Sequence, residues 1–165
     1  MKPLKARSEK GLAAEIDGQW WLLESPTDYA KAVLLMKRYV NFYKDGLLHR
    51  DNGPAVIRAD GSKYWYKSDK LHRAAGPAVI GADGTEFWYL NGERHREDGP
   101  AIIGADGSKY WYLNGKRHRI GGPAFVQADG SQFWYLKGRR HRNDGPAIIR
   151  ADGGEEWYRN GKFIK

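Results

Sequence analysis

Hydrophobic and polar positions alternate along this chain in an order that returns every 23 residues. The stretch from Tyr89 to Trp111 contains that order once, with an Asn-Gly pair, a His-Arg pair, a Gly-Pro-Ala run and an Asp-Gly pair between its aromatic ends. The same unit begins, without insertions, at Tyr43, Tyr66, Tyr112 and Tyr135, and a truncated sixth copy begins at Tyr158. A fixed period of this length indicates one supersecondary unit per copy, stacked on its neighbours so that together they bury a continuous core.

Each unit contains two short apolar runs, which predict two strands. In the third copy these runs are Pro100 to Ile103 and Lys109 to Leu113. Asp106-Gly107 lies between them and Asn114-Gly115 follows the second. Asp-Gly and Asn-Gly tolerate the positive φ that two-residue hairpin turns need, so the pattern favours a hairpin in every repeat.

Strand alternation gives the second run two different faces. Tyr110 and Tyr112 are expected on one side, and Trp111 and Leu113 on the other. Both sides of the sheet would therefore carry rows of aromatic residues.

The residues before the first repeat predict a hairpin and a helix. Leu12 to Leu23 resembles a degenerate half-copy, which indicates an end hairpin or strand. Ser25 is a good helix cap, with Pro26 at the first helical position and Asp28 in the first turn. An apolar stripe broad enough to cover a sheet face follows, at Tyr29, Ala32, Val33, Leu35, Met36, Tyr39, Val40 and Phe42.

The expected fold class is an all-β repeat array. Stacked β-hairpins would form one elongated, twisted antiparallel sheet, with one N-terminal α-helix as a cap. Residues 1–42 would comprise a basic arm, the degenerate hairpin and the capping helix. Residues 43–165 would comprise five 23-residue hairpin repeats and the truncated sixth copy.

Composition narrows the functional classes. The aromatic content of 13% is high beside a hydrophobic content of 41%, so aromatic surfaces would carry much of the burial. The absence of cysteine excludes disulfides, thiolate nucleophiles and cysteine metal sites, and fits a reducing compartment. No secretory h-region or membrane-length apolar run is present. We therefore expect a cytoplasmic protein, in the host cytoplasm if its source is viral.

The repeat resembles the MORN family, whose units have the same length and combine an aromatic strand, an Asn-Gly turn, a basic stretch with histidine, and an Asp-Gly-Ser turn. The matching residues are Tyr110, Trp111, Asn114-Gly115, Lys116 to His118 and Asp129 to Ser131. The resemblance covers Tyr43 to Lys165, although Arg96, Arg119 and Arg142 stand where that family has glycine. The variant with His-Arg before Gly-Pro-Ala is similar to repeats in uncharacterised phage, giant-virus and bacterial proteins. The resemblance implies a non-enzymatic hairpin array used for protein interaction, scaffolding and sometimes membrane association.

The His-Arg pairs are the first candidate binding residues. They recur at His49/Arg50, His72/Arg73, His95/Arg96, His118/Arg119 and His141/Arg142. Two strands per repeat would separate equivalent imidazoles by about 10 Å, too far for two of them to share a zinc ion. The net charge of +8 favours anionic partners, which a row of arginines could bind. The alternative is structural: each histidine would satisfy a turn carbonyl, and each arginine would pair with a neighbouring acid.

Aromatic residues are the second candidate set. The tryptophans that recur once per repeat are best explained as core: Trp65, Trp88, Trp111, Trp134 and Trp157. The tyrosines that follow the first four are better candidates for a working surface, because a phenol tolerates water: Tyr66, Tyr89, Tyr112 and Tyr135. The Asp-Gly aspartates are expected to form turns, and a regular ladder would not give two carboxylates the unlike environments of an acid-base pair. We expect no enzymatic activity, cofactor or metal.

The sequence therefore predicts a non-enzymatic protein that binds a protein partner on an aromatic and basic sheet surface. In a phage, such a surface would serve to inhibit a host protein. The alternative function is nucleic-acid or nucleotide-phosphate binding through the His-Arg pairs. Attachment to an anionic membrane is weaker, and dimerisation through an open sheet edge stays open. Three departures from regularity mark places where a partner would touch the array: Ser68-Asp69, Ala74-Ala75 and Ile120-Gly121.

Overall fold

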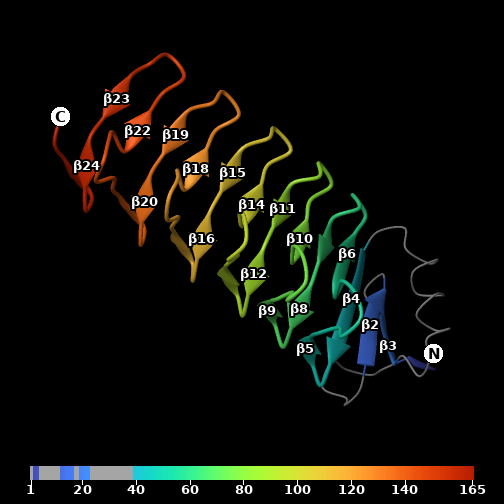
Figure 1. The fold of residues 1–165 in the computed structure, drawn as a ribbon. Helices are drawn as coiled ribbons and strands as arrows, with labels where there is room; N and C mark the ends of the chain where they lie inside the picture. Colours follow the sequence, from blue (N-terminus) through green and yellow to red (C-terminus); the bar gives the residue numbers. More distant parts are fainter. Residues whose placement is uncertain (1, 4–11, 17–18, 23–38) are drawn as a thin grey trace. The chain divides into compact units, whose positions relative to one another are not determined.

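The structure is a computed structural model that describes residues 2–3, 12–16, 19–22 and 39–165, with side chains described from residue 40 onwards. The chain divides into two units, Met1–Ala82 and Asp83–Lys165, which are described separately. All regular structure in the described ranges is β-strand, and the repeats form hairpins as the 23-residue period predicts (Figure 1). No described segment is a helix with the length and apolarity to cross a bilayer.

The first unit has a main sheet and a small separate hairpin. Its strands are β1 (Lys2–Pro3), β2 (Leu12–Ile16), β3 (Gln19–Leu22), β4 (Tyr39–Lys44), β5 (Leu47–Leu48), β6 (Val56–Arg58), β7 (Lys63–Tyr64), β8 (Tyr66–Lys67), β9 (Lys70–Leu71) and β10 (Val79–Ile80). The main sheet has the order β1-β3-β2-β4-β6-β7-β10, β5 pairs with β4, and β8 pairs only with β9. The described strands of this unit pair in antiparallel fashion; Ala13 lies opposite Leu22, and Val40 opposite both Ile16 and Ile57.

The second unit repeats one arrangement with little change. Its strands are β11 (Glu86–Phe87), β12 (Tyr89–Leu90), β13 (Glu93–Arg94), β14 (Ile102–Ile103), β15 (Lys109–Tyr110), β16 (Tyr112–Leu113), β17 (Lys116–Arg117), β18 (Phe125–Val126), β19 (Gln132–Phe133), β20 (Tyr135–Leu136), β21 (Arg139–Arg140), β22 (Ile148–Ile149), β23 (Glu155–Glu156), β24 (Tyr158–Arg159) and β25 (Lys162–Phe163). The main sheet has the order β11-β14-β15-β18-β19-β22-β23. The pairs β12-β13, β16-β17, β20-β21 and β24-β25 form two-stranded sheets along one edge of this unit, opposite the Asp-Gly turns (Figure 1).

Each repeat passes from the main sheet to its small hairpin at the tryptophan. The Trp111 amide donates to the Ala124 carbonyl at 2.8 Å, and the Trp111 carbonyl accepts from the His118 amide at 3.1 Å. Equivalent bonds recur at Trp65, Trp88 and Trp134. Trp111 thus separates β15 from β16 while its own backbone groups stay paired.

The two turns of a repeat differ in length. Asn114 and Gly115 both have positive φ, 48° and 70°, which is the two-residue hairpin turn that Asn-Gly favours. In the Asp-Gly turn only Gly107 has a positive φ, 87°, and the Gly104 amide reaches the Ser108 carbonyl at 2.8 Å, so this turn is longer than expected. The Asp106 carboxylate explains the difference, because it accepts the Ser108 amide at 2.9 Å.

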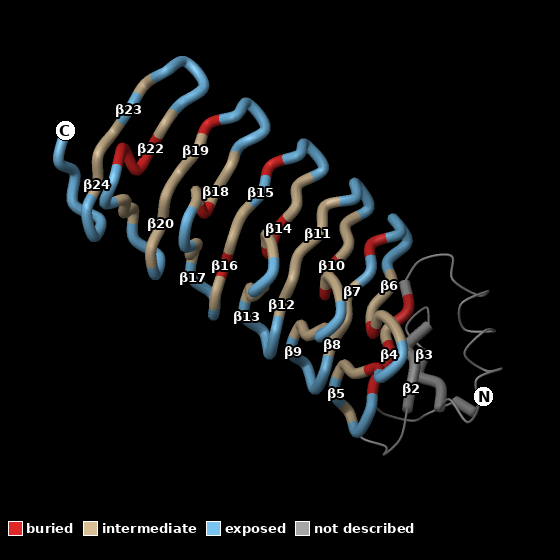
Figure 2. Tube along the Cα trace, viewed as in Figure 1, coloured by how far each residue is buried: buried red, intermediate tan, exposed pale blue. Residues whose placement is uncertain are grey.

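Burial is shallow and recurs with the repeat. In the second unit the core cluster consists of Ala101, Ile102 and Tyr112, with Phe87, Trp88 and Tyr110 packed against it. Figure 2 shows the buried residues of this unit as short stretches within otherwise half-buried strands. Hydrogen bonding and stacking between repeats must therefore supplement a thin apolar core.

Two parts of the expected fold class are wrong. Tyr39, Val40 and Phe42, placed at the end of the capping helix, lie in strand β4. Val40 and Phe42 are fully buried, and their spacing of two residues fits a strand as well as it fitted the helical stripe. The rest of the expected helix, residues 25–38, lies outside the described residues. A single sheet is also wrong, because part of each repeat forms the separate small hairpins.

Candidate functional site

The segment from each histidine to the following Gly-Pro pair, which we call the His-Arg loop, connects the small hairpin to the main sheet. The five His-Arg loops are residues 49–54, 72–77, 95–100, 118–123 and 141–146. Four of the five loop arginines lie over a tryptophan ring, with the guanidinium carbon of Arg119 4.0 Å from the Trp111 centroid. The other arginine, Arg50, lies 4.4 Å from the ring of Phe42.

Each loop arginine is also hydrogen-bonded to its own loop. The Arg119 Nη1 donates to the Pro123 carbonyl at 3.2 Å, and the same bond recurs from Arg50 to Pro54, Arg73 to Pro77, Arg96 to Pro100 and Arg142 to Pro146. A ring contact and a carbonyl bond together fix the guanidinium plane. Burial lowers the pKa of Arg50 to about 10, since this arginine is the most enclosed of the five.

The glycine of each Gly-Pro pair is explained by the arginine three residues earlier. A Cβ on Gly99 would lie 2.9 Å from the guanidinium carbon of Arg96, and one on Gly145 would lie 2.8 Å from that of Arg142. Any larger residue would push the guanidinium from its ring. The recurring spacing from Arg to Gly-Pro is therefore a packing requirement.

The loop histidines connect neighbouring repeats. The Nδ1 atom of His118 accepts the Lys137 amide at 3.2 Å, and that of His141 accepts the Asn160 amide at 3.1 Å. His49 and His95 make the same bond to the turns that follow them, with Ser68 and Asn114. The expected bond was to a turn carbonyl, but the histidine accepts a turn amide from the next repeat. Metal-ligating groups of three or more acids or histidines are absent from the described ranges.

Only some of the loops have an aspartate that accepts a hydrogen bond from the arginine Nε atom. The Arg96 Nε atom donates to Asp98 at 2.9 Å, and the Arg142 Nε atom donates to Asp144 at 3.1 Å. Each arginine holds the pKa of its aspartate below the usual value, chiefly through this side-chain hydrogen bond. The corresponding position is Gly121 in loop 118–123 and Ala75 in loop 72–77.

Arg119 consequently has an incomplete set of partners. Among the described residues its guanidinium contacts the Trp111 ring and the Pro123 carbonyl, and its Nε atom has no acceptor. Gly121 has a φ of 75°, whereas none of the residues at the same position of the other four loops has a positive φ. Loop 118–123 thus differs from the others in its backbone as well as in its side chains.

Ile120 lies at the tip of this loop with 85% of its surface exposed. Open grooves lie on both sides of it. One, of about 480 Å³, is lined by Arg96, Trp111, Leu113 and Ile120 among others. The next, of about 510 Å³, is lined by Ile120 and by the equivalent residues Arg119, Trp134 and Leu136, and also by Arg142. The first unit has a similar groove of about 510 Å³, which contains Trp65 and Arg73.

Two of the candidate tyrosines line these grooves: Tyr66 lines the groove of the first unit, and Tyr135 lines the second groove beside Ile120. The hydroxyls of Tyr89, Tyr112 and Tyr135 accept hydrogen bonds from the arginines five residues later, at 3.1, 3.1 and 3.5 Å. Tyr112 is buried, and Tyr66 and the other two are half-buried. Tyr66 thus shares a groove with Arg73, and Tyr135 shares one with Arg119, whereas the hydroxyls of Tyr89, Tyr112 and Tyr135 bond to a different row of arginines.

A second row of arginines was missed at the sequence level. Arg94, Arg117 and Arg140 immediately precede the loop histidines and lie among the tyrosines, and the Nη1 atom of Arg117 also reaches the Tyr135 hydroxyl at 3.3 Å. The signal was their recurrence at the 23-residue period in copies three to five, where the first two copies have Leu48 and Leu71.

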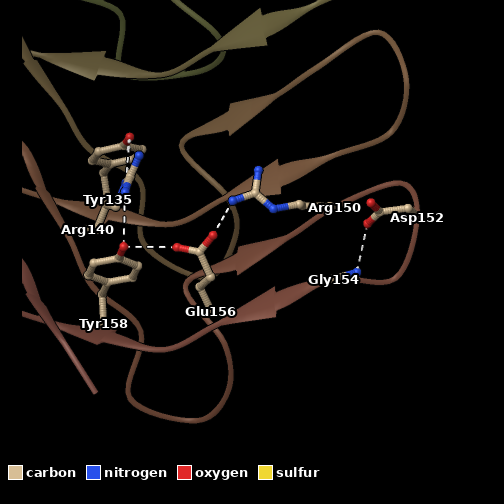
Figure 3. A network of polar contacts seen from close by, with 7 residues as sticks. All are labelled: Tyr135, Arg140, Arg150, Asp152, Gly154, Glu156 and Tyr158. Atoms are coloured by element: carbon tan, nitrogen blue, oxygen red, sulfur yellow. Dashed lines mark hydrogen bonds and ion pairs between the residues drawn. The ribbon is translucent and has the colours of Figure 1, made fainter. Parts of the chain in front are cut away.

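Figure 3 shows the C-terminal end of this row. Arg140 lies between Tyr135 and Tyr158, whose hydroxyl donates to Glu156 at 2.9 Å. Glu156 also pairs with Arg150. The pKa of Glu156 is lowered, first by the Tyr158 hydroxyl and then by Arg150. This carboxylate gives the last arginine of the row an acidic neighbour, which Arg94 and Arg117 do not have among their described contacts.

Searches with protein-family models and against curated proteins gave no match to this chain.

Proposed function

We propose that the chain is a non-enzymatic repeat protein of the MORN type that binds a protein partner, and that binding centres on the His-Arg loop 118–123. The observation that carries the proposal is Ile120, exposed at 85% between two grooves with aromatic floors. Burying an isoleucine side chain contributes about 1.5–3 kcal/mol. An isoleucine at 85% exposure buries little apolar surface on folding, so a partner that covers it would gain most of this free energy.

The residues around Ile120 are of the kinds that dominate protein interfaces. Trp111 and Trp134 line the grooves, and Arg119 and Arg142 flank them. Tryptophan and arginine are enriched among the residues that carry most of the binding free energy in such interfaces. The grooves are open rather than enclosed, which suits an extended segment or a loop of a protein better than a small metabolite.

The recurring polar residues favour a scaffold over an enzyme. Asp60, Asp83, Asp106, Asp129 and Asp152 each accept an amide in their own turn. They therefore share one environment, whereas acid-base catalysis needs two carboxylates with separated pKa values.

A photo-crosslinking residue at position 120 tests the proposal. The same residue at Asn143, which is the equivalent position of the next loop, is the control. In cells of the source organism, position 120 should give protein adducts that position 143 does not. The purified adduct protein should then bind the Ile120→Asn variant at least about 10-fold more weakly, from the lost apolar burial. Equal adducts at both positions, or unchanged affinity, would refute the proposal.

A second candidate function is nucleic-acid or nucleotide-phosphate binding. The His-Arg pairs support it less than the second arginine row does, because the loop arginines are packed on rings and carbonyls. Arg94 and Arg117 lie beside half-buried aromatic rings and donate to tyrosine hydroxyls. Phosphate binding through this row predicts an affinity for oligonucleotides that falls steeply with salt. Arg117→Leu, which copies Leu71, should reduce the salt slope by about one; no binding at low salt would remove this candidate.

A further inference from the structure

Loops 95–100 and 141–146 show how a complete His-Arg loop is held together. In each, the guanidinium has a tryptophan ring on its face, a proline carbonyl at Nη1 and an aspartate at Nε. Loop 118–123 keeps the first two contacts and has Gly121 in place of the aspartate. Three contacts define the arrangement, and one of them is missing at Arg119.

The missing acceptor position faces solvent. Asp98 and Asp144, which fill it in the neighbouring loops, have side chains that are 83% and 82% exposed. A carboxylate from another molecule can therefore approach Arg119 Nε from the direction these aspartates occupy. Ile120 is adjacent, so the approaching group meets an apolar surface beside a cation.

We infer, on the basis of the proposed function, that the partner binds with an aspartate or glutamate whose carboxylate takes on Arg119 the place that Asp98 takes on Arg96. An apolar residue next to that acid packs against Ile120 and into an adjoining groove. The recognised segment is thus a short one with a single acidic residue between apolar neighbours. Charge complementarity agrees with this, since the chain carries +8 and loop 118–123 has no acid.

The surroundings of Arg119 disfavour a nucleic acid. Glu97 and Asp98 lie in the preceding loop and Asp144 in the following one, and Asp98 and Glu97 line the same groove as Arg119. A chain of phosphates passing over Arg119 would meet these carboxylates on both sides, whereas a segment with one charge would not. Ile120 also gives a phosphate backbone no favourable contact.

Two blocked tripeptides that differ in one group test the inference on the full-length protein. The probes are acetyl-Leu-Asp-Leu-amide and acetyl-Leu-Asn-Leu-amide, and the readout is the NMR signal of each arginine Nε–H. The aspartyl peptide should shift the Arg119 signal and bind at least about 10-fold more tightly than the asparaginyl peptide, because a charged acceptor strengthens the bond. Arg96 and Arg142 should not shift, since their Nε atoms are occupied. No Arg119 shift up to the solubility limit, equal shifts with both peptides, or a shift with a single-stranded oligonucleotide alone would overturn the inference.

A double variant in which loop 118–123 has the sequence of another loop is the matched control for the peptide experiment. Ile120→Asn with Gly121→Asp gives loop 118–123 the sequence of loop 141–146, which folds in this chain. The peptide-induced shift should disappear while the remaining spectrum stays unchanged. Aspartate and asparagine both tolerate the positive φ of Gly121 better than most residues.

Affinity measurements with the isolated partner distinguish a failure of this inference from a failure of the proposed function. Gly121→Asp should weaken partner binding at least about 10-fold, and Gly121→Asn, which adds the same bulk without a charge, should not. If Ile120→Asn weakens binding but Gly121→Asp and Gly121→Asn have the same effect, loop 118–123 is a docking surface but the partner does not place a carboxylate on Arg119. If none of the three variants changes the affinity, both fail.

Discussion

The glycine before each proline tests whether the loop arginines hold the repeats together. Gly99 has no positive φ, so alanine fits its backbone, and such a replacement normally stabilises a protein by about 0.4–1 kcal/mol through the unfolded chain. A Cβ at this position would nevertheless lie 2.9 Å from the guanidinium carbon of Arg96. Because the guanidinium is the free end of a flexible side chain, it would swing away rather than distort the backbone.

The loss of stability in Gly99→Ala therefore equals the free energy of the contacts that Arg96 would give up. The stacking on Trp88, at 4.2 Å, contributes about 1–2 kcal/mol at a half-buried site. The bond to the Pro100 carbonyl, at 3.3 Å, adds about 1 kcal/mol. The ion pair with Asp98 adds little, because the Asp98 side chain is 83% exposed. After subtracting the gain in the unfolded chain, Gly99→Ala should lower the free energy of unfolding by about 1–2 kcal/mol.

A double-mutant cycle with Arg96→Ala isolates this effect. In the Arg96→Ala background the added methyl group meets no guanidinium, so Gly99→Ala should become neutral or stabilising. Urea unfolding gives the free energies, and hydrogen exchange at the Trp88 and His95 amides reports the local change, since both amides bond across this loop. An equal cost of Gly99→Ala in both backgrounds would refute the packing explanation of the Arg-to-Gly spacing.

Three further predictions concern contacts between repeats and within turns. Ser108, which is 3% exposed, accepts the Ala128 amide through Oγ, so Ser108→Ala should cost about 1–3 kcal/mol in urea unfolding and speed exchange at that amide. His118→Ala should cost less, about 0.5–1 kcal/mol, because the Lys137 amide it releases can bind water; its exchange rate should rise. The Ser108 amide, followed by its hydroxyl, lowers the pKa of Asp106, so the folded state holds the ionised form more strongly than the unfolded chain does. The stability that Asp106 contributes is then fully present above its unfolded pKa of about 4, and it is lost as the pH falls through the lower folded value. In Asp106→Asn, the urea concentration at the unfolding midpoint should therefore decrease less steeply as the solution is acidified.

The 23-residue period predicted the hairpins because each turn carries its own local chemistry. Asn114-Gly115 specifies a two-residue turn without help from distant residues. The helix prediction failed from Tyr39 onwards because Val40 and Phe42 satisfy a helical stripe and a strand alternation equally well. Only pairing with β2 and β6, which depends on residues far along the chain, decides between them.

The candidate site was predictable in part. Ile120-Gly121 stands out from the sequence as a break in the repeat, without any structure. The stacking of Arg119 on Trp111 cannot be read from the sequence, because a hairpin and its connections separate the two residues. Arg117 was missed for a similar reason: in the sequence it merges with the basic run before His118, and only the fold places it beside Tyr112 and Tyr135.

A comparison with Arg73 distinguishes the two proposed parts of recognition, the carboxylate bound by the arginine and the apolar contact with Ile120. Like Arg119, it stacks on a tryptophan, bonds its proline carbonyl and has no aspartate two residues later, because Ala75 stands there. Its loop has Ala74 where the other has Ile120, so the carboxylate position is similar while the apolar neighbour is smaller. The aspartyl tripeptide should therefore shift the Arg73 Nε–H signal with the same preference over the asparaginyl peptide.

The affinity at Arg73 should be lower, because partial burial of an isoleucine is worth on the order of 1 kcal/mol, or about 5-fold. Ala74→Ile should recover most of that difference, and Ile120→Ala should remove it from the other loop. Equal affinities at the two arginines would mean that the carboxylate alone drives binding and that Ile120 takes no part. A shift at Arg119 with none at Arg73 would mean instead that the missing aspartate does not create the carboxylate site.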